Sequence, residues 1–205
     1  MSEPGPRVAL TFDAEHPDRP RCPPDAAERI LGALREAGAR ASFFLQGRWA
    51  LSQPALARTV AEDGHLIGHH SHHHARMTLL TDRGVREDVA EGERAIRETT
   101  GADPRPWFRC PFGDGHDDPR IIEALGELGY RNVHWHVEVE DWEPWRTAED
   151  VVRGVLEGVR AHGDGAVVLL HTWPEPTAEA LPRLLADLEG EGARLLRVDE
   201  LEALP

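Results

Sequence analysis

Histidines gather in one short stretch of this chain, at a spacing that is typical of metal ligands. Five of the six residues from His69 to His74 are histidine. Neutral imidazoles bind zinc, nickel, cobalt and iron, and histidines four residues apart on a helical turn can reach one ion. Two pairs have this spacing, His70 with His74 and His69 with His73, and the spacing does not choose between them. Because the stretch is internal, we interpret it as a metal site rather than a purification tag.

Further residues with acid–base chemistry come after short apolar runs. Asp13 and Glu15 follow the first such run, and Arg109, Asp141 and His171 come after later ones. In parallel α/β proteins the carboxyl ends of the strands meet at one edge, and active sites are built there. The sequence therefore predicts that these residues and the histidines share one site.

Seven apolar runs predict the strands that would position these residues. The runs are continuous rather than alternating, which favours parallel strands covered on both faces. Amphipathic helical stretches lie between them, and Ile121, Ile122, Leu125 and Leu128 form one such apolar face. Seven strands alternating with about six helices predict an α/β domain, either a closed or distorted barrel or an open doubly wound sheet. The expected strands are 7–13, 40–46, 65–68, 107–109, 131–137, 166–171 and 194–198.

The composition excludes several classes of function. A length of 205 residues and a hydrophobic fraction of 40% suit one globular domain over residues 1–205. The formal net charge of −14 argues against a protein that binds nucleic acid or an anionic membrane surface. All 23 basic residues are arginine, so a lysine Schiff base and a Walker-type phosphate loop are excluded. Cys22 and Cys110 lie far apart and indicate neither a disulfide framework nor a thiolate zinc site.

The first residues show neither the basic flank nor the long apolar core of a signal peptide, and no apolar run is long enough to span a bilayer. We therefore expect a cytoplasmic protein. The sequence contains no coiled-coil signal, and it leaves the oligomeric state open.

Five short motifs carry a resemblance to a known family. In this order they resemble the motifs of the polysaccharide deacetylase family, also called the NodB-homology family or carbohydrate esterase family four. The resemblance implies a single-domain distorted (β/α) barrel with about seven parallel strands, and a metal-dependent hydrolase that removes acetyl groups from N-acetylated sugars. The motifs are Thr11-Phe12-Asp13, His70-Ser71-x-x-His74, Arg109-x-Pro111-Phe112-Gly113, Asp141-Trp142 and Leu169-Leu170-His171.

The resemblance also implies roles for individual residues. His70 and His74 would bind a divalent metal, zinc first, with cobalt, nickel, manganese or iron as alternatives. Asp13 would be the general base. His171 would be the general acid, held protonated by Asp141.

Four more residues complete the implied site. Arg109 would orient the catalytic carboxylate through a bidentate contact, which suits its planar guanidinium group. Phe112, Trp142 and Trp173 would contact the substrate, with a backbone N–H near Phe112 facing the developing oxyanion and the tryptophans forming the wall of the cleft.

The first motif departs from the family pattern, Thr-Phe-Asp-Asp, because position 14 is alanine. In one interpretation Asp13 remains the base and Glu15, two residues further along an extended strand, replaces the missing ligand. In another, Asp13 binds the metal and the base comes from elsewhere. His16 is a further candidate ligand. We favour Asp13 as base and Glu15 as ligand.

Three functions remain open at this point. The first is deacetylation of an N-acetylated sugar or oligosaccharide. The second is hydrolysis of a small cytoplasmic amide, ureide or cyclic imide, which the expected location favours. The third is a metal-binding or sugar-binding domain without catalytic activity, which Ala14 favours.

Overall fold

The computed structural model describes residues 5–17 and 22–203. The expectation of one domain over residues 1–205 therefore includes residues 1–4, 18–21 and 204–205, which lie outside the described part. Within the described part, no helix is both long and apolar enough to cross a membrane.

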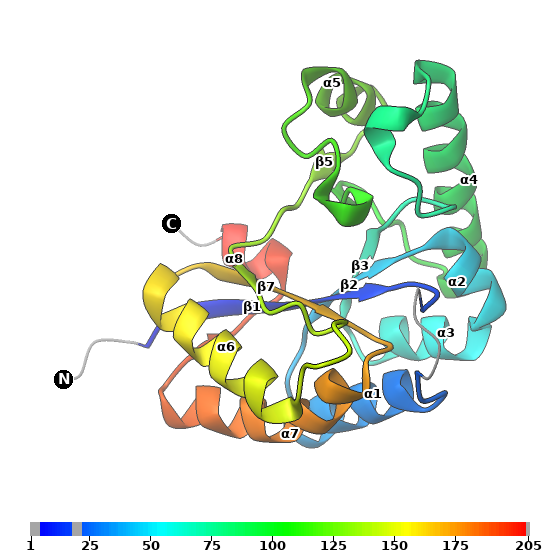
Figure 1. The fold of residues 1–205 in the computed structure, drawn as a ribbon. Helices are drawn as coiled ribbons and strands as arrows, with labels where there is room; N and C mark the ends of the chain where they lie inside the picture. The colour runs from blue at the N-terminus through cyan, green and yellow to red at the C-terminus, as the bar shows by residue number, and fades with distance from the viewer. Residues whose placement is uncertain (1–4, 18–21, 204–205) are drawn as a thin grey trace.

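A curled parallel sheet forms the centre of the fold (Figure 1). Seven strands follow the order β5-β4-β3-β2-β1-β7-β6, and β8 pairs with the start of β1. Every pairing is parallel, so the carboxyl ends of the strands share one edge. The expected distorted barrel is confirmed. The strands are β1 Arg7–Ala14, β2 Ser42–Leu45, β3 Leu66–His69, β4 Trp107–Phe108, β5 Arg131–Asn132, β6 Val137–Glu138, β7 Ala166–His171 and β8 Arg194–Leu195.

One expected strand was wrong, because the stretch 131–137 divides into β5 and β6. These two strands are the two edges of the sheet, and residues 133–136 connect them. The N–H of Val133 donates to the carbonyl of Phe108, and the N–H of His136 donates to the carbonyl of Val167. The stretch therefore bonds to β4 at its start and to β7 at its end, so it cannot form one strand on one neighbour.

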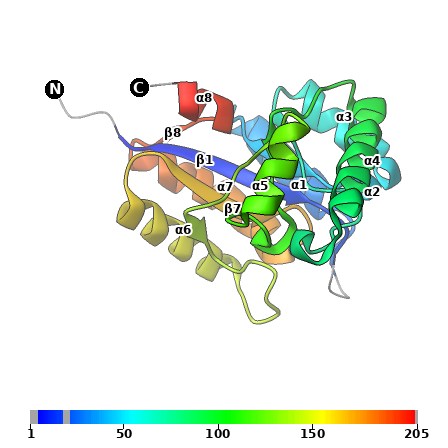
Figure 2. The ribbon, with the colours of Figure 1, turned by 90° about the horizontal axis from the view of Figure 1, so that it is seen from above.

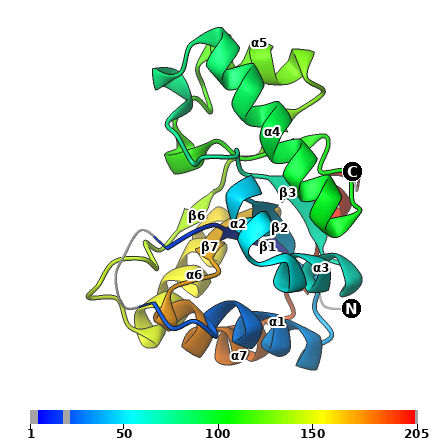
Figure 3. The ribbon, with the colours of Figure 1, turned by 90° about the vertical axis from the view of Figure 1, so that its right-hand side faces the viewer.

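Helices cover the sheet in two groups. Helix α7 lies between α1 and α6 on one side, and α4 packs against α2 and α3 on the other (Figures 1 and 3). The view in Figure 2 places α8 beside the start of β1. The helices are α1 Ala26–Glu36, α2 Gly47–Ser52, α3 Pro54–Glu62, α4 Asp82–Thr100, α5 Pro119–Glu127, α6 Ala148–His162, α7 Glu175–Gly190 and α8 Val198–Ala203, with short 3₁₀ turns at Met77–Leu79 and Pro111–Gly113.

The apolar face expected around α5 is partly wrong. Ile121 and Leu125 are buried as expected, but Ile122 is 49% exposed. Ala124 takes its place in the buried face, because it lies three residues after Ile121 on the same side of the helix.

Strand β7 crosses the middle of the core, where truncation of a side chain has a large cost. Leu170 is fully buried, so Leu170→Ala should lower the free energy of unfolding by about 2–5 kcal/mol. Leu79 is 79% exposed, and Leu79→Ala should change it by no more than about 0.5 kcal/mol. Urea unfolding of both variants measures the difference. Equal changes would contradict the central position of β7.

Candidate active site

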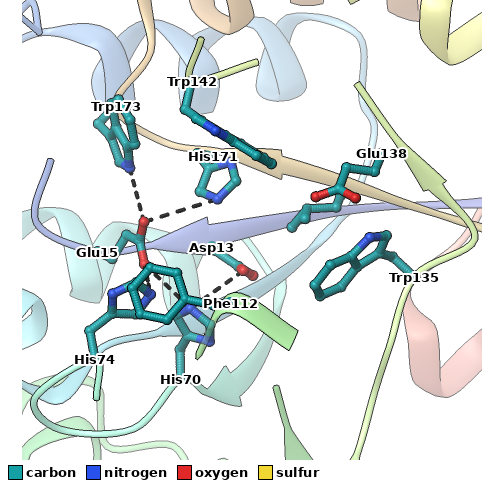
Figure 4. A pocket seen from close by; sticks show the side chains of 11 residues that line it. Asp13, Glu15, His70, His74, Phe112, Trp135, Glu138, Trp142, His171 and Trp173 are labelled. Atoms are coloured by element: carbon teal, nitrogen blue, oxygen red, sulfur yellow. Dashed lines mark hydrogen bonds and ion pairs between the residues drawn. The ribbon is translucent and has the colours of Figure 1, made fainter. Parts of the chain in front are cut away.

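A cavity of about 290 Å³ opens at the carboxyl ends of the strands (Figure 4). It brings together eight of the ten residues that the sequence predicted for the site. The other two, Arg109 and Asp141, lie behind the wall and contact residues that line it. The lining residues are Asp13, Glu15, His70, His74, Phe112, Trp135, Glu138, Trp142, Leu169, His171 and Trp173.

Asp13 in β1 and Glu15, the residue directly after the last residue of β1, place two carboxylates in this cavity. Successive side chains of a strand point to opposite faces, so Asp13 and Glu15 share one face and Ala14 takes the other. Both carboxylates are 3% exposed and line the cavity, whereas Ala14 packs in the hydrophobic core. Ala14 therefore faces the core, and Glu15 supplies the second carboxylate of the cavity.

Glu15, His70 and His74 form a cluster with the geometry of a metal site. Glu15 Oε2 lies 3.3 Å from His70 Nε2 and 2.5 Å from His74 Nε2. All three ligand atoms lie within 4.8 Å of one another. Two imidazole nitrogens and one carboxylate oxygen, with space left in the cavity, are typical of a catalytic site that keeps open positions for water and substrate.

Hydrogen bonds orient the two imidazoles. His70 Nδ1 lies 2.9 Å from the carbonyl oxygen of Arg109. A carbonyl oxygen only accepts, so Nδ1 donates and Nε2 keeps its lone pair toward Glu15. The N–H of His74 donates to Ser71 Oγ at 2.8 Å, and both residues have a positive φ of 58°. This turn brings His74 back over His70, with ring centroids 5.0 Å apart.

The alternative pair, His69 with His73, does not form a metal-binding group. The ring of His69 is fully buried between Phe108 and Tyr130, and neither ring nitrogen has a hydrogen-bond partner among the described residues. Burial lowers the pKa of His69 to about 3, so the ring is neutral and packs as an apolar side chain. His70 and His74 are therefore the pair that faces the cavity.

The charges of the cluster suit a bound cation. Glu15 Oε2 is buried, and no described group forms a well-aligned hydrogen bond with it. Burial raises the pKa of Glu15, but the imidazoles of His70 and His74 outweigh burial and bring this pKa well below its ordinary value. Burial lowers the pKa of His70, but Asp13 and Glu15 more than reverse this effect. The same negative potential that favours a proton here favours a metal cation, so the donor set fits a divalent metal.

Arg109 holds Asp13 from below the cavity. Its side chain is fully buried, and Nη1 donates to Asp13 Oδ1 at 2.9 Å. The predicted bidentate contact was wrong, because Nε donates instead to the carbonyl of Val133 at 3.1 Å. The guanidinium group also lies 4.1 Å above the centre of the Phe44 ring, which fixes its plane. Only one nitrogen therefore bonds to Asp13.

His171 lies opposite Asp13, since the two residues are register partners on the neighbouring strands β7 and β1. His171 Nδ1 contacts Asp141 Oδ1 at 2.8 Å, and the His171 N–H donates to Asp141 Oδ2 at 2.8 Å. Burial lowers the pKa of His171, but the charge and hydrogen bond of Asp141 outweigh it, with help from Glu15, and raise this pKa to about 9. At neutral pH the His171 imidazole is therefore protonated and can donate from Nε2.

Aromatic rings complete the wall, and their contacts differ. Phe112 is half-exposed and its ring lies 4.4 Å from that of His74, whereas Trp142 meets the edge of His171 at 4.9 Å. Trp173 Nε1 donates to Glu15 Oε1 at 3.2 Å, which orients the carboxylate (Figure 4).

Three further residues belong to the site. Trp135 lines the cavity from the stretch that connects β5 and β6, and Glu138 lines it from β6. Thr177, in the first turn of α7, donates its hydroxyl to Asp141 Oδ2 at 2.5 Å. A motif search finds residues that follow strands, and it gives no signal for a threonine that reaches the site from a helix.

Comparisons with known proteins identify the family to which this chain belongs. A family model described as polysaccharide deacetylase matches residues 1–133. Peptidoglycan-N-acetylglucosamine deacetylase PgdA of Listeria monocytogenes is 31% identical over 195 residues, 95% of this chain and 38% of that protein. A family 4 carbohydrate esterase from Streptomyces lividans, solved with acetate, is 30% identical with a TM-score of 0.80, covering 94% of this chain and 92% of that one.

A third similar protein shows that the fold can exist without activity. BA3943 of Bacillus anthracis is a pseudoenzyme, and a mutant of it with restored activity is 25% identical to this chain, with a TM-score of 0.85 over 96% of this chain and 67% of that one. The chain spans only 38% to 52% of the length of PgdA and of another curated relative. The matched model, the order of the motifs and the shared fold together show that the chain belongs to the polysaccharide deacetylase family.

Proposed function

We propose that this protein is a metal-dependent deacetylase that hydrolyses the N-acetyl group of an amino sugar within an oligosaccharide or polysaccharide. The observation that carries the proposal is the meeting of the Glu15–His70–His74 cluster with Asp13 and His171 in one cavity. Family membership and the deacetylase named PgdA support the same reaction. We propose zinc as the metal, because two imidazoles and one carboxylate suit it.

The residues divide the work of amide hydrolysis. Glu15, His70 and His74 would hold the divalent cation, which when bound would supply a Lewis acid for the acyl oxygen and for the attacking water. Asp13 accepts the proton of that water on Oδ2, because Arg109 occupies Oδ1. The water oxygen bonds to the acyl carbon, and the C–N bond breaks as His171 Nε2 donates its proton to the departing nitrogen. The products are acetate and the free amino sugar.

The charge of the cavity favours a neutral sugar. Three carboxylates line it, those of Asp13, Glu15 and Glu138, and among the described lining residues the only cationic type is histidine. The cation and the protonated His171 offset Asp13 and Glu15, so a carboxylate on the substrate would meet the charge of Glu138 without an arginine partner. The flat rings of Trp135 and Trp142 offer apolar faces to a pyranose. We therefore propose N-acetylglucosamine units rather than acidic N-acetylmuramic acid units.

Acetate release from chitooligosaccharides tests the proposal directly. Purified protein treated with a chelator should be inactive, and added zinc should restore turnover. Peptidoglycan fragments with muramic acid at the reacting unit should be hydrolysed more slowly, and Glu138→Gln should reduce this difference. No acetate release by the zinc-loaded protein from any N-acetylated glycan would overturn the proposed function.

Asp141 controls the alkaline side of the pH profile. His171 donates only while protonated, so activity should fall as the pH rises through its pKa of about 9. Asp141→Asn removes the charge that raises this pKa, and the alkaline limb should move toward the ordinary histidine value of about 6.5. The pH dependence of kcat for both proteins measures the shift. Thr177→Val keeps the charge of Asp141 and should move the alkaline limb less. If Asp141→Asn and the unmodified protein have the same alkaline limb, His171 is not the general acid.

A further inference from the structure

Two histidines of the stretch 69–74, His72 and His73, do not line the cavity, and both lie near a carboxylate on α4. His72 Nε2 lies 3.5 Å from Glu91 Oε1, and His73 Nε2 lies 3.7 Å from Glu91 Oε2. The three ligand atoms all lie within 4.8 Å of one another. This group shares no residue with the Glu15–His70–His74 cluster.

The separations agree with metal coordination. Zinc bonds of about 2.0–2.1 Å in tetrahedral geometry place neighbouring ligand atoms about 3.4 Å apart. The two His–Glu91 separations, which end on different oxygens of the exposed Glu91 carboxylate, are slightly longer than this value. Arg94 is the described cation near this carboxylate, at 3.9 Å and two-thirds exposed, and such a surface contact is weak.

The backbone of both histidines is fixed by the same helix that carries Glu91. Asp88 is buried one turn earlier on α4, and its two oxygens accept the N–H groups of His72 at 2.8 Å and His73 at 3.0 Å. Through Asp88, helix α4 therefore keeps the backbone of His72 and His73 close to Glu91. Such anchoring lowers the entropy that would be lost when a metal orders the side chains.

Space for the ring of His72 comes from a glycine. A Cβ atom at Gly47 in α2 would lie 2.5 Å from His72 Nδ1, so only glycine allows the ring to lie in this place. The ring is therefore packed against α2, 5% of the residue is exposed, and Nε2 is directed toward Glu91.

From this geometry we propose that His72, His73 and Glu91 form a second metal site, for a borderline divalent cation such as zinc, nickel or cobalt. Solvent fills the remaining coordination positions, because His73 and Glu91 are about half-exposed. The site links α4 to the loop that carries His74, so a bound ion joins two elements next to the cavity. It does not depend on the proposed deacetylase reaction.

Equilibrium dialysis of the full chain against zinc, followed by metal analysis, tests the second site. The unmodified protein should bind two equivalents. Glu91→Gln and His73→Asn should each lose one equivalent, with an affinity decrease of more than about tenfold. His70→Asn should lose the other equivalent and retain the one at Glu91. Glu87→Gln changes another exposed glutamate of α4 and should keep both.

The outcomes separate this site from the cavity. A single equivalent in the unmodified protein, lost in His70→Asn and retained in Glu91→Gln, would overturn the second site and leave the proposed function standing. If Glu87→Gln also loses one zinc equivalent, the zinc binds to surface carboxylates in general. This outcome would also overturn the second site. Circular dichroism of the metal-free variants checks that each substitution leaves the fold intact.

Discussion

Asp13→Asn is expected to lower kcat for deacetylation by about 10²–10⁴-fold, the contribution of a positioned general base. Asparagine keeps the size of the side chain and can still accept from Arg109 through its amide oxygen, but it cannot take a proton from water. The metal content should not change, because Glu15 and the two histidines supply the ligand atoms. Steady-state kinetics and metal analysis of the same sample measure both quantities.

Glu138→Gln is the matched control for this experiment. It neutralises another carboxylate of the same cavity that contacts neither Arg109 nor the histidines in the described contacts, so kcat on a neutral substrate should change far less. Full turnover by Asp13→Asn would refute the base assignment. Loss of the metal from Asp13→Asn would instead support the other interpretation of the first motif, in which Asp13 is a ligand.

Glu15→Gln should abolish activity through loss of the metal. Glutamine replaces a charged oxygen ligand with a neutral amide and removes the negative charge that attracts the cation. We expect the zinc affinity of the cavity site to fall by more than about 100-fold, beyond the usual effect of losing an outer-shell partner. Isothermal titration with zinc measures the affinity, and acetate release at increasing zinc concentration measures the partial recovery of activity.

Trp173→Phe provides a graded comparison. It removes the N–H that orients Glu15 at 3.2 Å and leaves all three ligands in place, so the affinity should decrease by only about 10–100-fold. If Glu15→Gln binds zinc as tightly as the unmodified protein, Glu15 is not the third ligand. If the zinc affinity falls equally in Trp173→Phe and in Glu15→Gln, Glu15 binds the metal only when Trp173 orients its carboxylate.

Much of the site could be predicted because it follows short-range rules. Alternation along one strand predicts that Asp13 and Glu15 share a face, and the structure places both in the cavity. The spacing of His70 and His74 allows a common ion, but it could not exclude His69 and His73. That choice depends on Phe108 and Tyr130, which reach His69 from distant parts of the chain.

Long-range contacts account for what the sequence could not predict. The stretch 131–137 is apolar enough for one strand, and it divides because its two halves bond to different strands. The single Arg109–Asp13 bond depends on the carbonyl of Val133, whose position no side-chain pattern records. Thr177 joins Asp141 from a helix that is 36 residues away in the sequence.

The register of β1 and β7 has a consequence for how this protein can diversify. Asp13 and His171 are partners on adjacent strands, so their spacing is tied to the inter-strand distance of about 4.8 Å that every sheet shares. Trp135 and Phe112, by contrast, lie outside the regular strands. Insertions or exchanges in those connecting segments can select a different glycan while the proton donor and acceptor keep their mutual placement, so new specificities can arise without rebuilding the chemistry.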